Sequence, residues 1–417
     1  MIHFPASMNF ISRMLALLAL PGSILAAESP AWEQQDSPVS GVPYHKVEDL
    51  RSFYKLTANS KSSRKGATSI GNADISLELG PGVRELSIGG LLVPLARPLQ
   101  KDAEGRWLIS REDWVCCIDP ILRPTYITGR EAVTTVILDP GHGGHDTGET
   151  TPHLRESDLT LKVAKMLKDE LEKQGYKVIL TRSEDNFVSD QQRVDTINSG
   201  GAGAILLSLH VNEGRSDFQG SSIYTLAPGG DTRPGHAKQT AHTALAYALQ
   251  SALVTQAGAA DAGIRHVHYS LLSSVTCPAV WVELGYATHA QEGAALATPA
   301  YQESLVHALA KGISTYAHVA NPATHIPVQE KPAPVASSAN KAAASQTSAA
   351  ASSTSSSTTT ASRKTSGSSS STSTSSRKTT GSGSDKTRTT TAQPQKQSGK
   401  NTGSRRRPQE PAGRTRT

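Results

Sequence analysis

Hydrophobic and polar residues alternate with a period of two in the first third of the chain. Short alternating segments bounded by Gly, Asn and Pro predict strands, and they follow one segment at 47–54 whose apolar residues have helical spacing. The predicted strands are 75–79, 84–88, 91–95 and 106–109. Residues 41–127 are therefore expected to form a small α+β accessory domain.

From residue 131 the pattern changes to strands that alternate with helices. The predicted strands are 134–138, 177–181, 204–209, 222–226 and 279–283, and the predicted helices are 159–171, 189–198, 239–253 and 301–316. Such alternation is typical of an α/β fold with a mostly parallel sheet flanked by helices. We expect residues 131–318 to form this domain and to carry the chemistry.

The amino-terminal segment has the pattern of a secretory signal peptide. Arg13 precedes an apolar run at 14–20, and small residues follow as far as Ala27. The apolar run is shorter than the roughly 20 residues that a membrane span requires. We therefore predict a signal peptide at 1–27, no transmembrane segment in the mature chain, and a location in the periplasm or the extracellular cell wall.

Residues 321–417 lose apolar periodicity and are rich in Ser, Thr, Ala, Gly and Lys, which predicts a disordered tail. They hold fifteen Lys and Arg against three Asp and Glu, a net charge of +12 that leaves −6 for residues 1–320 of the whole-chain +6. A basic nucleic-acid surface on the folded part is therefore not expected. Spaced cations on a flexible chain suit anionic envelope polymers or lipid head groups, and a solvated linker without a specific partner is an equal alternative.

The three cysteines, Cys116, Cys117 and Cys277, cannot all pair with one another, so a disulfide framework is not expected. Cys277 precedes an apolar run, and we interpret it as a buried free thiol that behaves as a small hydrophobic residue. A catalytic thiol is the alternative.

Three predicted strands lead to a histidine or a carboxylate. His142 lies in a Gly-rich loop after the strand 134–138, His210 follows 204–209, and Glu283 ends 279–283. Because the carboxyl ends of parallel strands meet at one edge of a sheet, these side chains are expected to lie together. A catalytic zinc ion takes three His or carboxylate ligands and leaves one position for water, so a third ligand is needed beside the two histidines.

The third ligand is not decided by spacing. The candidates between the two histidines are Asp146, Glu149, His145, His153 and Glu156. Glu156 begins the helix that follows the His142 loop, which would provide a rigid platform for a ligand. A carboxylate at a helix start also favours the helix dipole, so ligation and capping are equally good interpretations.

Four separated blocks, 138–144, 154–161, 208–212 and 278–286, resemble the zinc-dependent N-acetylmuramoyl-L-alanine amidases of the third amidase type. The resemblance covers roughly 134–316. It implies Zn²⁺ held by His142, Glu156 and His210, with Glu283 as the catalytic carboxylate. It also implies hydrolysis of the amide between N-acetylmuramic acid and L-alanine in peptidoglycan, for wall remodelling or daughter-cell separation.

Two further positions and the accessory domain have less specific interpretations. Asn212 matches an Asn of the family and would act around the ligands. Asp139 is interpreted as a group that fixes the loop, and metal ligation is the alternative. Segments 89–98 and 108–114 are similar to copper amine oxidase amino-terminal-like accessory domains, which implies a binding or positioning role.

Two other functions fit the same residues. A zinc peptidase that cuts between stem amino acids would use the same metal set, because either amide is open to the same chemistry. A wall-binding module with a defunct site is the second alternative, although all four expected residues are present.

Overall fold

The computed structural model describes residues 35–36, 41–59, 68–71, 75–79, 83–127, 129–229 and 234–324. All of them belong to one compact unit, Met1–Ser337. The predicted signal peptide, and the predicted tail beyond residue 324, lie outside the described residues. Among the described helices, none combines the length and the apolar character needed to cross a membrane.

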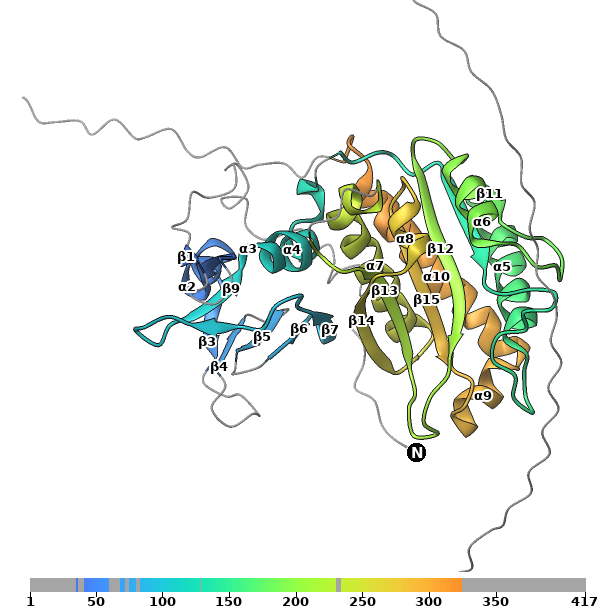
Figure 1. The fold of residues 1–417 in the computed structure, drawn as a ribbon, viewed down its shortest axis with the longest axis horizontal. Coiled ribbons are helices and arrows are strands. Elements are labelled where there is room, and N and C mark those ends of the chain that lie inside the picture. Colours follow the sequence, from blue (N-terminus) through green and yellow to red (C-terminus); the bar gives the residue numbers. More distant parts are fainter. Residues whose placement is uncertain are drawn as a thin grey trace, which may run out of the picture. The chain divides into compact units, whose positions relative to one another are not determined.

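A six-stranded sheet organises the second part of this unit (Figure 1). Its strands are β10 (Thr135–Pro140), β11 (Lys177–Leu180), β12 (Ala204–Asn212), β13 (Ser221–Leu226), β14 (Asp261–Val267) and β15 (Ala279–Tyr286), in the order β11-β10-β12-β15-β13-β14. The first four strands in this order are parallel, and β13 runs antiparallel to β15. The expected mostly parallel sheet is confirmed.

Helices cover both faces of this sheet. They are α5 (Glu156–Lys173), α6 (Asp190–Asn198), α7 (Gln239–Gln256), α8 (Ser270–Ser274), α9 (Ala290–Leu296) and α10 (Pro299–Ala320). Neighbouring strand residues point to opposite faces, and accordingly Val136 and Leu138 join the hydrophobic cluster of α5, α7 and α10. Ile137 joins a second cluster with α6 and α8.

The second face, which we call the α6/α8 face, is hydrophobic along only part of its length. Its cluster includes Ile137, Leu206 and Ala279. Two residues further along β10, β12 and β15, the positions on the same face are Asp139, Ser208 and Trp281. The α6/α8 face therefore changes from a hydrophobic core to polar and aromatic side chains toward the carboxyl ends of the parallel strands.

The amino-terminal segment contains two antiparallel sheets. Their strands are β1 (Gln35–Asp36), β2 (Pro43–Lys46), β8 (Gln100–Lys101) and β9 (Trp107–Ser110) in one sheet, and β3 (Thr57–Asn59), β4 (Thr68–Gly71), β5 (Ile75–Leu79), β6 (Glu85–Ile88) and β7 (Leu91–Pro94) in the other. The helical elements are α2 (Val47–Phe53), α3 (Arg111–Asp113), the π-helical turn η1 (Trp114–Ile118), α4 (Asp119–Leu122) and the 3-10 turn η2 (Pro124–Tyr126). The α+β character expected for this segment is present.

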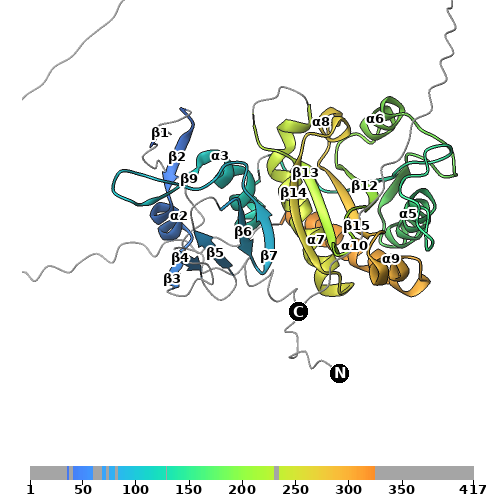
Figure 2. The same ribbon diagram turned by 60° about the horizontal axis from the view of Figure 1, so that its bottom comes forward.

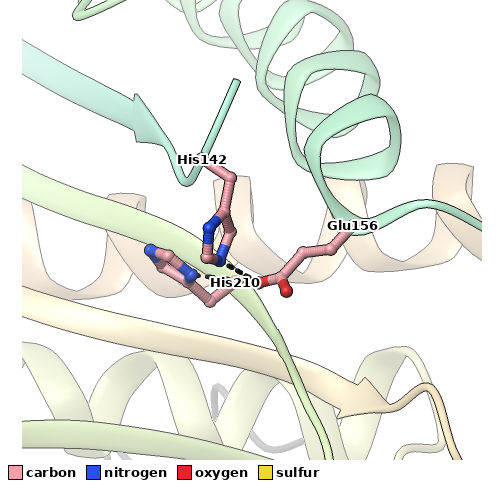
Figure 3. Close-up of side chains that lie close together, drawn as sticks. All are labelled: His142, Glu156 and His210. Carbon is pink, nitrogen blue, oxygen red and sulfur yellow. Dashed lines mark hydrogen bonds and ion pairs between the residues drawn. The ribbon is translucent and has the colours of Figure 1, made fainter. Parts of the chain in front are cut away.

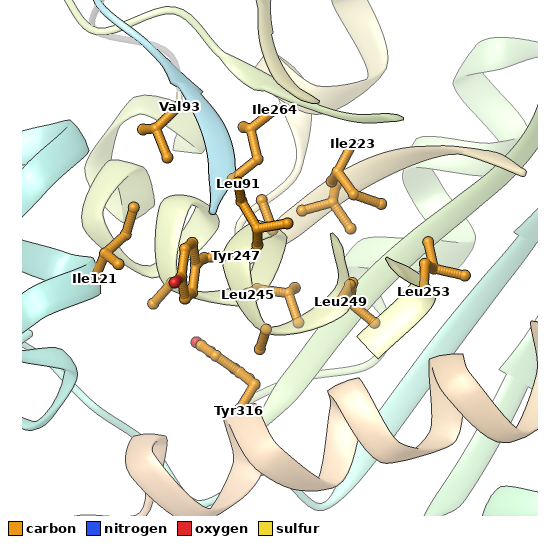
Figure 4. Close-up of a cluster of buried hydrophobic side chains, with 14 of the residues drawn as sticks. Leu91, Val93, Ile121, Ile223, Leu245, Tyr247, Leu249, Leu253, Ile264 and Tyr316 are labelled. Atoms are coloured by element: carbon orange, nitrogen blue, oxygen red, sulfur yellow. The ribbon is translucent and has the colours of Figure 1, made fainter. Parts of the chain in front are cut away.

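The two predicted domains share one hydrophobic core. Strand β7 lies beside β14 (Figure 2), and the Leu92 amide donates a hydrogen bond of 3.0 Å to the Asp261 carboxylate. Leu91 of β7 packs into the same cluster as Ile223 and Ile264 (Figure 4). The predicted boundary between residues 127 and 131 thus falls inside one compact unit and stays a prediction.

All three cysteines are free thiols in the structure. Cys117 and Cys277 are buried, and burial raises the pKa of the Cys277 thiol to about 12. The interpretation of Cys277 as a buried free thiol is confirmed.

Candidate metal site and catalytic carboxylate

The loop after β10 holds His142 in an uncommon backbone conformation. His142 has φ 60°, in the left-handed region that residues other than glycine seldom adopt. Hydrogen bonds of 2.7 and 3.2 Å between the backbone groups of Gly143 and Asp146 close the loop. Backbone strain of this kind persists where the surrounding structure enforces it, often at functional sites.

His142, Glu156 and His210 converge from the loop, the first residue of α5 and the end of β12 (Figure 3). Glu156 Oε1 lies 3.2 Å from His142 Nε2 and 3.0 Å from His210 Nδ1. One possible ligand atom from each residue lies within 4.8 Å of the other two. Glu156 and His210 are buried, whereas His142 is partly exposed.

This donor set fits zinc, because two imidazole nitrogens and one carboxylate oxygen are a common set for a catalytic zinc ion. Burial lowers the pKa of His210, which favours the neutral form that binds metals. Burial alone would raise the pKa of Glu156, but hydrogen bonds with His142 and His210 lower it below its usual range. The hydrogen bond to Glu156 raises the pKa of His142 to about 9, so a cation would compete with a proton there.

Asp146 orients the first histidine. Both Asp146 carboxylate oxygens lie 2.9 Å from His142 Nδ1, which leaves Nε2 directed toward Glu156. A carboxylate partner on the other ring nitrogen fixes the orientation of a metal-binding histidine and increases its basicity. From the sequence Asp146 is a candidate ligand only; the spacing His-x-x-x-Asp within a Gly-rich loop is the signal that could have indicated its supporting role.

Gly141 allows the loop to approach His210 closely. A Cβ atom at this position would lie 2.1 Å from His210 Cε1 and 2.4 Å from its Nε2. We therefore expect Gly141→Ala to displace the His210 ring and to weaken zinc binding at least tenfold, with a matching loss of activity. Competition with a zinc chelator measures the affinity. Gly175→Ala is the control for a destabilising Gly-to-Ala change away from the ligands, because nothing lies within 4 Å of the added methyl group but the backbone φ of 91° strains a residue other than glycine. Equal zinc affinity for Gly141→Ala and the unchanged chain would contradict this role.

Two buried arginines hold together the segments that carry the candidate ligands. Arg182 donates hydrogen bonds to the carbonyl oxygens of Gly141 (2.8 Å) and Ser157 (2.9 Å), next to His142 and Glu156 respectively. Arg193 donates to the His142 carbonyl at 2.8 Å and forms an ion pair of 2.5 Å with Asp139.

Asp139 is surrounded by donors beneath the loop. It also accepts hydrogen bonds from Thr181 and Ser208, at 2.5 and 2.7 Å. Burial would raise the pKa of Asp139, but Arg193 and these hydroxyl groups lower it. The geometry supports the proposal that Asp139 fixes the loop rather than binding the metal.

Removing the Arg182 guanidinium should loosen the site without removing a ligand. Arg182→Leu leaves buried carbonyl oxygens unpaired, and each such loss costs about 1–3 kcal/mol. We expect a decrease of several degrees in melting temperature and weaker zinc binding. Thermal unfolding followed by circular dichroism, with and without added zinc, measures both effects. A decrease in melting temperature with unchanged zinc affinity would limit Arg182 to a purely structural role.

Glu283 lies opposite His210 in the paired strands β15 and β12. Its Oε1 accepts a hydrogen bond of 2.7 Å from the Trp281 indole nitrogen, and its Oε2 has no hydrogen-bond partner among the described residues. Burial raises the pKa of Glu283 to about 8. One carboxylate oxygen is thus fixed while the other is available for proton transfer.

Four further candidates from the sequence make other contacts. Asn212 donates its side-chain amide to the Ser222 hydroxyl at 3.3 Å. The His145 ring packs against Phe187, with ring centroids 4.3 Å apart. Glu149 contributes its backbone amide to Glu156 Oε2 at 2.9 Å, and His153 is exposed. Neither the side chain of Glu149 nor those of His145 and His153 belongs to the described cluster of potential metal ligands.

Comparisons with known proteins match the part of the chain that carries this site. Residues 136–315 match the family model described as N-acetylmuramoyl-L-alanine amidase. The chain is 30% identical over 183 residues to N-acetylmuramoyl-L-alanine amidase LytC of Bacillus subtilis, covering 44% of this chain and 35% of LytC. It is 29% identical over 182 residues to the uncharacterized protein YqiI of the same organism, covering 44% of this chain and 84% of YqiI.

Among solved structures, N-acetylmuramoyl-L-alanine amidase AmiC2 of Nostoc punctiforme is 30% identical, with a TM-score of 0.39 and coverage of 44% of this chain and 96% of AmiC2. The matched region contains the strands and helices that position His142, Glu156, His210 and Glu283. Residues 136–315 therefore belong to the N-acetylmuramoyl-L-alanine amidase family.

Proposed function

We propose that this chain is an exported, zinc-dependent amidase that hydrolyses the amide between N-acetylmuramic acid and L-alanine of peptidoglycan stem peptides. The observation that carries the proposal is the convergence of His142, Glu156 and His210 within 4.8 Å, on the same sheet edge as Glu283. Family membership of residues 136–315 supports the choice of bond.

His142, Glu156 and His210 would hold the metal, and Asp146 would keep His142 in its binding orientation. A zinc ion held there would lower the pKa of a water molecule and polarise the substrate carbonyl. Glu283 then accepts the proton of the attacking water at its unpartnered Oε2 and delivers it to the departing amine of L-alanine. No serine or cysteine nucleophile is needed, which agrees with the buried state of Cys277.

The proposed setting is the cell envelope, where the substrate lies. Export rests on the signal-peptide pattern of residues 1–27, and contact with anionic envelope polymers rests on the basic composition of residues 321–417. Cell-wall remodelling or daughter-cell separation is the corresponding role.

Digestion of isolated sacculi tests the proposed bond. The purified chain should contain about one zinc ion, in accord with the three-ligand site, and should release intact stem peptides that begin with L-alanine. Mass spectrometry should find glycan strands with free lactyl carboxyl groups. Fragments cut between stem amino acids, with L-alanine still attached to muramic acid, would instead identify a zinc peptidase. Zinc and wall binding without any product would identify a defunct module.

A further inference from the structure

A strip of side chains that is open to solvent starts beside the candidate metal site and crosses the sheet from there. On the α6/α8 face the hydrophobic cluster includes Leu226 and Ala279. The next positions on this face are Tyr224 of β13 and Trp281 of β15, which are directly paired, and Arg265 of β14 is paired with Tyr224. Tyr224 and Trp281 are partly buried and Arg265 is exposed, so this strip is open to solvent.

Aromatic rings follow one another along this strip. Trp281 stacks on His210 with centroids 3.5 Å apart and an angle of 8° between the planes. Tyr269, which precedes α8 and is 40% exposed, lies 4.8 Å from Trp281 and 6.3 Å from Tyr224 between ring centroids. We refer to Trp281, Tyr269 and Tyr224 as the aromatic strip. It begins in contact with a candidate metal ligand.

The aromatic strip continues into a groove at the junction with the amino-terminal segment. Tyr224 and Arg265 line this groove of about 480 Å³ together with Arg84 and Glu85. The Arg265 guanidinium is held in place by the Ala262 carbonyl at 2.7 Å and by Glu85 at 3.3 Å. From β12 to β14 the strip spans three strand spacings, roughly 14 Å, which is longer than one sugar ring.

We propose that the aromatic strip and this groove bind the glycan strand next to the muramic acid whose amide is cut, an inference that rests on the proposed function. Pyranose rings present apolar C–H faces that pack on aromatic rings, and their hydroxyl and N-acetyl oxygens accept hydrogen bonds from guanidinium groups. A groove that joins a row of aromatic rings at Tyr224 and contains the fixed Arg265 guanidinium suits such a ligand.

The strand arrangement favours glycan over the stem peptide in the aromatic strip. A peptide that joins a sheet needs a free strand edge. Here β15 lies between β12 and β13, and β13 lies between β15 and β14 (Figure 1). The outer side of β14 faces β7, where Asp261 accepts the Leu92 amide. Over the described part of the strip, ring stacking is therefore the main means of recognition.

Binding of peptide-free glycan strands to the zinc-loaded full chain carrying Glu283→Gln tests the inference by isothermal titration calorimetry. Tyr269→Ala and Tyr224→Ala should each weaken glycan binding about five- to tenfold, as expected for the loss of one stacked ring. Tyr126→Ala is the matched control, because Tyr126 is 37% exposed and lies in η2, which contacts α10 on the opposite side of the sheet. Trp281 is left unchanged because it contacts His210 and Glu283.

Each outcome decides one point. Unchanged glycan affinity in both tyrosine variants overturns the inference, and so does a selective loss of binding to free stem peptides. Circular dichroism of the same samples shows that the variants are folded. If glycan binds through these tyrosines but the chain with Glu283 intact releases no stem peptide from sacculi, the proposed function alone is contradicted.

Discussion

Replacing Glu283 with Gln is expected to abolish measurable release of stem peptides while zinc remains bound. Gln keeps the size of the side chain and still accepts the 2.7 Å hydrogen bond from Trp281, but it cannot take a proton. Loss of general acid–base catalysis typically lowers a rate by about 10²–10⁴-fold. Product formation is measured by mass spectrometry of digested sacculi, and zinc content by elemental analysis of the same preparation.

Glu213→Gln is the matched control for this substitution. Glu213 follows Asn212 at the same edge of the sheet, but its side chain does not belong to the described metal cluster. The Glu213→Gln variant should retain most of the activity. If Glu283→Gln releases peptides as fast as Glu213→Gln, another group must transfer the proton, and the role proposed for Glu283 is wrong.

The substitution Glu283→Gln should also stabilise the metal-free protein at alkaline pH. Burial raises the pKa of Glu283 from 4.5 to about 8, so the folded state holds this proton more tightly than the unfolded state. Ionisation of the buried Glu283 carboxyl group therefore lowers the free energy of unfolding. This loss is absent below pH 4.5, grows as the pH rises, and is complete above about pH 8. Urea unfolding at several pH values should show Glu283→Gln gaining up to a few kcal/mol over the unchanged chain, only toward higher pH. A constant difference at every pH would contradict the raised pKa.

Periodicity predicted most of the α/β architecture because buried parallel strands and amphipathic helices leave clear patterns. Strand β14 was missed. In its segment Asp261–Val267 the larger apolar residues, Ile264 and Val267, are three apart, which does not suggest a strand. Its position beside β13 and β7 depends on tertiary packing that the local sequence does not encode.

The convergence of the strand ends was foreseeable, but the groups that support it were not. Arg182 and Arg193 act on backbone carbonyl oxygens of a loop, and such contacts depend on the loop conformation rather than on residue spacing. Trp281 was interpreted as part of an apolar strand segment. In the structure its ring stacks on His210 and its indole nitrogen donates to Glu283, because the α6/α8 face changes from core to open surface at this position.

Glu156 illustrates where the sequence left two interpretations open. Its carboxylate does not cap the first turn of α5, since Oε1 accepts the Val211 amide and Oε2 accepts the Glu149 amide, both at 2.9 Å. The side chain is instead turned toward His142 and His210. The geometry therefore supports the proposed ligand role over a helix cap.

Glu156→Gln should consequently lower zinc affinity by more than a hundredfold and remove activity with it. Loss of a ligand should exceed the 10–100-fold effect typical of residues that only support ligands. Glu149→Gln is the control, because Glu149 contributes its backbone amide to Glu156 and its own carboxylate lies outside the ligand cluster. Elemental analysis after dialysis should find zinc in Glu149→Gln and almost none in Glu156→Gln. Full zinc occupancy in Glu156→Gln would exclude Glu156 as a ligand, because its amide could not replace a charged carboxylate between two imidazoles at equal affinity.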